Sequence, residues 1–447
     1  MERTADSYFS YTTKALSTTS IYTQIPGLLL PMKFDLQHST MSPVLPFDII
    51  SLIIDIVGEN KDTNLLKELA LVSHSFLQIC SKHLFATVEL HDAVPDYHVA
   101  SSKKGFVKLL KSRPDVVKYI RKLTYKVAPT YPSFDNDHQF SSILPNLLRT
   151  ISLLSYLAIK ASKLDWNTLD SSLTSALLHL MHLPTINHID LSMIQNFPLF
   201  SLTPSVNLHR LDILYLRLEE NGPKIVQSEM MPKIREFRTS ESFMLTTNLL
   251  LAKRQDGQPA FNFMDLRRLS ISTTVPEDEW NLRYLLQNAK LLEKLHLSVG
   301  LGCSLVGLHD ILSPIASTLN VLDLTVSLYV DLPLAGLCDE LEAMAGHNML
   351  EALSFEVRVN GDETEDAIGS IIQNVEKVLV KPGWPALKQV SFELSIACCQ
   401  VSREDSAKLS EALQSLPDKY LSQLSKLESV SFNFSAYVVE CIFGIQL

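Results

Sequence analysis

The chain has 447 residues, a formal net charge of -10 at pH 7, and 46% apolar residues. This apolar content is enough for a sizeable core and excludes a globally disordered chain, while the acidic balance argues against nucleic acid or an anionic membrane surface as a partner. No stretch reaches the ~18 apolar residues of a membrane-spanning helix, and the six cysteines lack disulfide-like spacing, so we expect a cytoplasmic or nuclear protein.

The hydrophobic pattern divides the chain into three stretches. Residues 1–41 are rich in Ser, Thr and Tyr without a sustained period, which predicts a disordered tail. Residues 42–90 are expected to form a small helical domain, and residues 91–447 a repeating array of strands and helices. Three short helices are expected in the helical domain, with start signals at Pro46, at Asp62 or Thr63, and at Ser73 or Ser75. The second helix is expected to run to Val72.

The first expected helix carries an excess of apolar residues. Its polar residues Asp48, Ser51 and Asp55 form one narrow stripe, and most of the remaining circumference is apolar. A surface helix normally has a single apolar stripe, and three helices in about 40 residues cannot bury so much surface among themselves. The excess is therefore expected to dock on the repeats of the same chain, on another protein, or on both.

A short apolar motif recurs along the rest of the chain. It has apolar residues at positions i, i+3 and i+5, and its starts are 22 to 40 residues apart. The starts are Ile120, Leu154, Ile186, Leu208, Leu266, Leu292, Leu319, Leu350, Leu387 and Leu427, with a weaker copy at Ile234, whose i+5 residue is Thr239. A strand followed by a helix, repeated, gives a parallel sheet with right-handed crossovers. The predicted fold class is α/β, an irregular leucine-rich-repeat-like solenoid with the parallel sheet concave and the helices convex.

Strand alternation predicts which side chains occupy the open face of this sheet. Residues i+3 and i+5 point into the core, so residues i+2, i+4 and i+6 point outward, and nearly all of these are polar. The candidate residues for binding a target on this face are Arg238, Arg268, His296, Asp323, Glu356 and Glu393. Their mixed charge favours a protein over a phosphate ligand. The alternative is a solvated sheet face that binds nothing.

The helical domain resembles an F-box. The resemblance rests on Leu45-Pro46 before an acidic and apolar helix, on Leu65-Leu66, on the run from Ala70 to Phe76, and on Leu84-Phe85. It is similar in particular to the F-box of fungal proteins that carry divergent leucine-rich repeats behind it. In that family the F-box binds the Skp-type adaptor of a cullin ubiquitin ligase, and the repeats hold a protein substrate. The resemblance implies these adaptor-binding residues: Leu45, Pro46, Ile49, Ile50, Ile53, Leu71, Val72 and Phe76.

The resemblance implies a non-catalytic substrate-recognition subunit of a cullin-type (SCF) ubiquitin ligase. No catalytic, cofactor or metal site is predicted, because the chain has no Gly-x-Ser-x-Gly motif and because His179, His182 and His188 have no ligand set at zinc-like spacing. The expected partners are the adaptor, through it a cullin, and a protein substrate, with neither nucleic acid nor a membrane. The alternative is a leucine-rich-repeat scaffold that binds a protein with no ligase attached.

Overall fold

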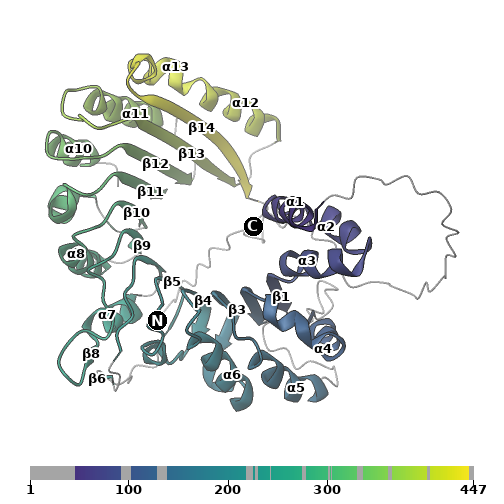
Figure 1. The fold of residues 1–447 in the computed structure, drawn as a ribbon. Helices are drawn as coiled ribbons and strands as arrows, with labels where there is room; N and C mark the ends of the chain where they lie inside the picture. Colours follow the sequence, from purple (N-terminus) through teal and green to yellow (C-terminus); the bar gives the residue numbers. More distant parts are fainter. Residues whose placement is uncertain are drawn as a thin grey trace, which may run out of the picture. The chain divides into compact units, whose positions relative to one another are not determined.

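The computed structural model describes most of the chain, in segments separated by gaps (Figure 1). The described residues are 46–91, 102–127, 138–217, 225–226, 230–241, 243–273, 278–300, 303, 305–329, 336–360, 365–399 and 403–441. Residues 1–41, for which the sequence predicts a disordered tail, lie outside them. The described chain forms two compact units. The N-terminal unit holds residues 46–162 and 168–186, and the C-terminal unit holds residues 163–167 and 187–441.

Three short helices open the N-terminal unit. They are α1 (Phe47–Glu59), α2 (Thr63–Ala70) and α3 (His74–Leu84). At both interior helix starts, the first of the two candidate residues forms the cap. The Asp62 carboxylate accepts the N–H of Leu65 at 3.0 Å, and the Ser73 hydroxyl accepts that of Phe76 at 3.3 Å. Pro46 lies just before α1, and its carbonyl accepts the N–H of Ile50 at 3.1 Å.

Helix α2 is two residues shorter than predicted. The N–H groups of Leu71 and Val72 donate to carbonyls three residues earlier, at 3.1 and 3.0 Å, which tightens the last turn. Ser73 follows in an extended conformation, with φ -159° and ψ 167°, and starts α3. Leu71 and Val72 therefore occupy the turn between the two helices and are not part of α2.

The core of this three-helix bundle is small. Four buried residues form its centre: Ile54, Leu66, Ile79 and Cys80. The apolar residues that pack against them are only partly buried: Ile50, Val57, Leu69, Ala70, Phe76 and Leu84. The bundle thus uses one apolar stripe of α1, namely Ile50, Ile54 and Val57, and leaves the rest of that helix for other contacts.

Gly58 lets the last turn of α1 approach α3. A Cβ atom at this position would lie 2.2 Å from Nδ1 of His83. Asp55 holds the ring in this place, because its Oδ1 lies 2.7 Å from His83 Nε2 and 2.6 Å from Lys82 Nζ. The Lys82 hydrogen bond lowers the pKa of Asp55 most, burial raises it, and the His83 hydrogen bond lowers it again, so the net shift is downward. The polar stripe of α1 therefore joins α1 to the end of α3.

The rest of the N-terminal unit alternates strands and helices. The strands β1, β2 and β3 are parallel and adjacent in this order. The bounds are β1 (Thr87–His91), α4 (Ser102–Ser112), the 3-10 helix η2 (Pro114–Tyr119), β2 (Lys122–Val127), α5 (His138–Leu148), β3 (Tyr156–Asp165) and α6 (Ser171–Met181). The end of β3 and most of the short η3 (Trp166–Thr168) belong to the C-terminal unit.

Strand β1 carries a copy of the repeat that the sequence analysis missed. Val88 pairs with Leu123, and Leu90 with Tyr125, so Phe85, Val88 and Leu90 stand at i, i+3 and i+5 of a further motif. The F-box resemblance assigned Phe85 to the end of the helical domain. The repeating array therefore begins directly after α3, before the first predicted start.

In the described part of the C-terminal unit, nine parallel strands lie side by side in the order β4-β5-β7-β9-β10-β11-β12-β13-β14. Their bounds are β4 (His188–Gln195), β5 (Arg210–Leu214), β7 (Glu236–Ser240), β9 (Arg268–Thr273), β10 (Lys294–Val299), β11 (Val321–Tyr329), β12 (Ala352–Asn360), β13 (Gln389–Cys399) and β14 (Ser431–Cys441). The short strands β6 (Ile225–Val226) and β8 (Lys253–Arg254) pair separately.

Helices and 3-10 turns connect these strands. They are η4 (Leu199–Leu202), α7 (Phe243–Leu251), α8 (Asp278–Asn288), α9 (Leu308–Leu312), η5 (Ser313–Ile315), α10 (Leu337–Met344), α11 (Glu365–Leu379), α12 (Arg403–Gln414), α13 (Leu416–Tyr420) and η6 (Leu424–Lys426). Because neighbouring strands are parallel, each connection must return the chain to the start of the next strand. In the C-terminal unit the helices lie along one side of the sheet (Figure 1). The predicted α/β class with a parallel sheet is confirmed, whereas the concave and convex sides of a solenoid stay a prediction.

The predicted alternation along the strands is also confirmed. In β10, Leu295 and Leu297 are buried, while Lys294 is exposed and His296 half-buried. Leu295 pairs with Leu269 of β9 and with Leu322 of β11, and the second apolar position pairs in the same way. The i+3 and i+5 residues thus form two continuous rows that are apolar except at Thr239 of β7, and the polar residues between them share the opposite face.

The last predicted repeat is out of register by two residues. The sequence analysis placed Val430 and Phe432 at i+3 and i+5. In the structure Val390 of β13 pairs with Phe432, and Phe392 pairs with Phe434, so Val430 precedes the strand. Apolar residues stand at the alternate positions 430, 432 and 434, so the sequence allows the motif to be placed on either Val430 and Phe432 or Phe432 and Phe434. Because side chains alternate with a period of two, this slip leaves every residue on its predicted face.

Candidate protein-binding faces

Helix α1 carries a second apolar stripe that the bundle does not use. Ile49, Leu52, Ile53 and Ile56 are 41%, 56%, 47% and 50% exposed. Their spacing of i, i+3, i+4 and i+7 places them on one face of the helix. We call these four residues the α1 stripe. Within the described part of the N-terminal unit, roughly half of each of these side chains remains uncovered.

The turn between α2 and α3 exposes two more apolar side chains. Leu71 is 86% exposed and Val72 is 65% exposed, because the tight end of α2 turns both away from the bundle core. Phe47 at the start of α1 and Leu65 in α2 are exposed as well. The α1 stripe, whose four residues share one helix face, is a contiguous exposed apolar surface, and such a surface marks an interaction site more often than a free surface.

The structure divides the residues predicted to bind the adaptor into two groups. Those that are exposed are Pro46, Ile49, Ile53, Leu71 and Val72. Ile50 and Phe76 are half-buried and pack against the bundle core, so they stabilise the bundle more than they offer surface to a partner. Leu45 lies outside the described residues. The predicted adaptor-binding set leaves out four exposed residues, Phe47, Leu52, Ile56 and Leu65, although helical spacing from Ile49 points to Leu52 and Ile56.

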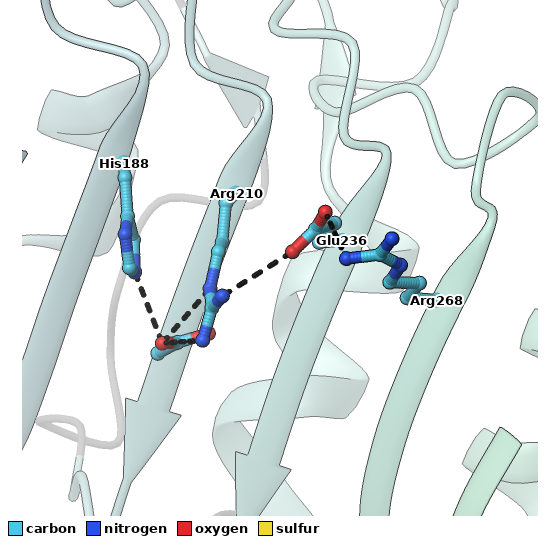
Figure 2. Close-up of polar contacts among 5 residues, drawn as sticks. His188, Arg210, Glu236 and Arg268 are labelled. Atoms are coloured by element: carbon cyan, nitrogen blue, oxygen red, sulfur yellow. Dashed lines mark hydrogen bonds and ion pairs between the residues drawn. The ribbon is translucent and has the colours of Figure 1, made fainter. Parts of the chain in front are cut away.

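The second candidate face is the open face of the C-terminal sheet, which carries the residues at i+2, i+4 and i+6. Figure 2 shows five charged or titratable residues there that form one chain of contacts across β4, β5, β7 and β9. His188 Nε2 lies 3.0 Å from Asp212 Oδ2, which also accepts Arg210 Nη2 at 3.0 Å. Arg210 Nη1 then reaches Glu236 Oε2 at 3.3 Å, and Arg268 Nη1 reaches Glu236 Oε1 at 3.1 Å. We call these residues the charge ladder.

Asp212 is the buried centre of the charge ladder, with only 4% of its surface exposed. Burial raises the pKa of this carboxyl, but the hydrogen bonds from His188 and Arg210 outweigh it and the net pKa is lowered. The hydrogen bond to Asp212 likewise raises the pKa of Arg210. The ladder therefore holds its charges in fixed positions and neutralises most of them internally.

The strands that follow carry further ion pairs on the same face. Lys294 Nζ lies 2.8 Å from Asp323 Oδ2, and Arg358 Nε donates to Glu356 Oε1 at 2.7 Å. His296 is half-buried among these groups. Burial lowers the pKa of its imidazole most, and the acidic residues Asp323 and Glu356 raise it only in part. At neutral pH the ring is therefore a neutral hydrogen-bonding group.

The structure brings all six predicted target-binding residues to one face, but they are not equivalent. Arg268, Asp323 and Glu356 are held in ion pairs with neighbouring strands or with their own strand. His296 is half-buried. Arg238 and Glu393 are exposed, and neither forms an ion pair within the part of the chain that the structure describes. The list of candidate residues left out the partners Arg210, Asp212, Glu236 and Lys294, although all four occupy outward positions of the same motif.

Two further features are absent from the described segments, a cluster of metal ligands and a membrane-spanning helix. No group of three or more His, Cys, Asp or Glu residues is arranged there to hold a metal ion. Of the clustered histidines, His188 contacts Asp212, while His179 and His182 lie exposed at the end of α6. None of the described helices combines the length and the apolar character needed to cross a membrane.

Comparisons with known proteins do not assign the chain to a family. No protein-family model matches the sequence. No curated protein matches it either. The chain is similar to a crystal structure of a protein from Bacteroides fragilis, with 9% sequence identity over 78% of this chain and 73% of that chain. The TM-score of 0.32 is too low to carry an argument about fold or function.

Proposed function

We propose that the protein is the substrate-recognition subunit of a cullin-type ubiquitin ligase, with residues 42–90 acting as an F-box that binds a Skp-type adaptor. The observation that carries the proposal is the α1 stripe together with Leu71 and Val72. These exposed apolar residues occupy the same segment as the F-box-like motif. The repeats behind it would form a leucine-rich-repeat solenoid whose open face holds a protein target.

The size of the exposed apolar surface agrees with this role. Each residue of the α1 stripe is about half exposed, so covering it recovers ~1 kcal/mol, or about half of what full burial provides. Leu71 and Val72 add ~1–2 kcal/mol each. The total of ~6–8 kcal/mol is comparable with an association cost of ~4–15 kcal/mol. An adaptor would thus have to cover both the stripe and the turn to bind stably.

In this proposal the protein performs no bond chemistry. The bundle would hold the adaptor and the open sheet face would hold the target. The ligase would then transfer ubiquitin to a lysine that is kept within reach, which is catalysis by proximity. The ion pairs of the charge ladder fit such a role, because fixed charges give specificity at an interface more than affinity.

Co-purification with a Skp-type adaptor tests the proposal. Wild type should form a stable complex, whereas Ile53→Lys and Leu71→Lys should each weaken it at least tenfold, because a charge replaces an apolar contact. Leu251→Lys is the matched control, since Leu251 is 52% exposed but belongs to α7 of the C-terminal unit. If the wild type does not bind the adaptor, the non-ligase scaffold becomes the better interpretation. Equal binding by all variants would place the interface elsewhere.

A further inference from the structure

The open face of the C-terminal sheet leaves two opposite charges without an ionic partner. Arg238 on β7 is exposed, and none of the described residues forms an ion pair with it. Glu393 on β13 is also exposed, and the contact the structure gives it is the Tyr437 hydroxyl, which donates to its Oε1 at 2.9 Å. The other solvent-accessible charges of this face in the described strands pair with one another, so these two remain for a ligand.

Arg238 lies beside a second guanidinium with free capacity. Arg268 on the neighbouring strand β9 is 63% exposed at its side chain and reaches Glu236 through Nη1 alone. A guanidinium has five donors in a planar fork that matches a carboxylate. The β7–β9 end of the face is therefore suited to an acidic group. The β13 end is suited to a basic group. The Oε1 atom of Glu393 accepts from the neutral Tyr437 hydroxyl, and its Oε2 atom remains for a cationic donor.

Polar side chains, three of them serines, separate the two ends. Register places Arg238 in one cross-strand row with Ser270, His296, Asp323, Ser354 and Ser391. The serines are small, and Ser391 Oγ donates to Ser354 Oγ at 2.8 Å. Such groups hydrogen-bond a peptide backbone without blocking its approach. The row therefore offers a polar path from one free charge toward the other.

The distance between the ends sets the spacing that a ligand must have. Five strand-to-strand steps lead from β7 to β13, and each measures ~4.8 Å, which gives ~24 Å. Glu393 stands two residues beyond Ser391, which adds a lateral offset of ~7 Å and gives ~25 Å in all. An extended chain rises ~3.3 Å per residue, so about seven or eight residues span this distance.

We propose that this face binds an extended protein segment that places an acidic residue on Arg238 and a basic residue, about seven or eight positions away, on Glu393. This inference rests on the proposed function in so far as the segment belongs to the target. It does not depend on the adaptor. It assigns the specificity of the face to two residues and describes the target by the order and spacing of its charges.

Selection from a random peptide display library on the immobilised full chain tests the proposal, with peptides of about 16 residues that exceed the span. Wild type should enrich peptides with an acidic and a basic residue at the stated spacing. Arg238→Glu should replace the acidic preference by a basic one, and Glu393→Lys should replace the basic preference by an acidic one. A selected peptide should bind Arg238→Glu about fivefold more weakly in fluorescence anisotropy, as expected for an exposed ion pair.

Arg267→Glu is the control for these variants. Arg267 immediately precedes Arg268 in sequence, is exposed, and pairs with Glu293 at the start of the strands, away from the open face. This substitution changes the same charge and should leave the selected sequences unchanged. Absence of any enrichment, or a consensus that ignores both Arg238→Glu and Glu393→Lys, would overturn the proposal. Adaptor binding measured on the same preparations keeps this outcome separate from a failure of the proposed function.

Discussion

Asp212 offers the sharpest test of the charge ladder. The substitution Asp212→Asn keeps the size of the side chain and removes its charge. Asp212 is 4% exposed and contacts both His188 and Arg210, each at 3.0 Å. The matched control is Asp323→Asn, which also removes one carboxylate from the open face. The Asp323 side chain is 26% exposed and pairs with Lys294 at 2.8 Å.

The two substitutions should differ in their effect on the free energy of unfolding. Hydrogen bonds to charged groups contribute ~1.5–3 kcal/mol and neutral ones ~0.5–1.5 kcal/mol, so losing the charge costs ~1 kcal/mol per contact. With two contacts, Asp212→Asn should destabilise the protein by ~2 kcal/mol. Asp323→Asn removes a more exposed pair, for which ~0–1 kcal/mol is expected.

The effect of Asp212→Asn should also depend on pH. The pKa of Asp212 is lowered in the folded protein from a reference value of 3.8. The stability that its carboxylate contributes is therefore complete above that reference value and is lost as the pH falls through the lower, folded pKa. Urea unfolding should show a constant gap between wild type and variant near neutral pH and a smaller gap at pH below about 4. Equal destabilisation by both variants at pH 7, or a gap that widens in acid, would refute this account of the ladder.

Three experiments test the packing inside each unit, each by urea unfolding. Gly58→Ala should destabilise the protein by ~1–2 kcal/mol despite the better helix propensity of alanine, because the added Cβ would lie 2.2 Å from the His83 ring. An unchanged urea midpoint would show that the His83 ring can move aside at little cost. Glu376→Leu should lower the free energy of unfolding by ~2–5 kcal/mol, because one buried oxygen of the Glu376 carboxylate accepts the N–H groups of Gln423 and Leu424 at 2.8 and 2.9 Å. Glu376→Gln keeps an accepting oxygen and should retain most of the stability, so equal losses in the two variants would contradict this reasoning. Ile54→Ala should lower the free energy of unfolding by ~2–5 kcal/mol and Leu52→Ala should lower it much less, because Ile54 is buried and Leu52 is exposed. Similar losses in the two variants would mean that the α1 stripe is already covered.

The repeat pattern predicts the sheet well because its apolar rows depend on local spacing. Leu295 and Leu322 could be aligned from the sequence alone, since both strands carry the same apolar interval and pair in parallel. The pattern fails where the same spacing can be read in two ways. Phe85 was assigned to the helical domain, although Phe85, Val88 and Leu90 together form a copy of the motif. In the last repeat, Phe432 and Phe434 allow a second placement of the motif, two residues from the predicted one.

The two candidate faces were predictable to different degrees. The apolar excess of α1 was visible in the sequence, but which stripe faces the bundle depends on contacts of Ile54 with α2 and α3. The open face was predicted as a set of polar positions. The sequence could not distinguish Arg238 from Arg268, because whether a guanidinium finds a carboxylate depends on side-chain geometry across strands. That distinction now identifies the charges left for a ligand.

Titration calorimetry of the full chain with a purified Skp-type adaptor tests the central claim most directly. The account predicts one-to-one binding with a negative heat-capacity change, since apolar surface is removed from water. It also predicts that Ile53→Lys abolishes the heat while Leu251→Lys preserves it. No binding by a folded wild-type chain, or binding that Ile53→Lys leaves intact, would contradict the claim that the exposed face of α1 holds the adaptor.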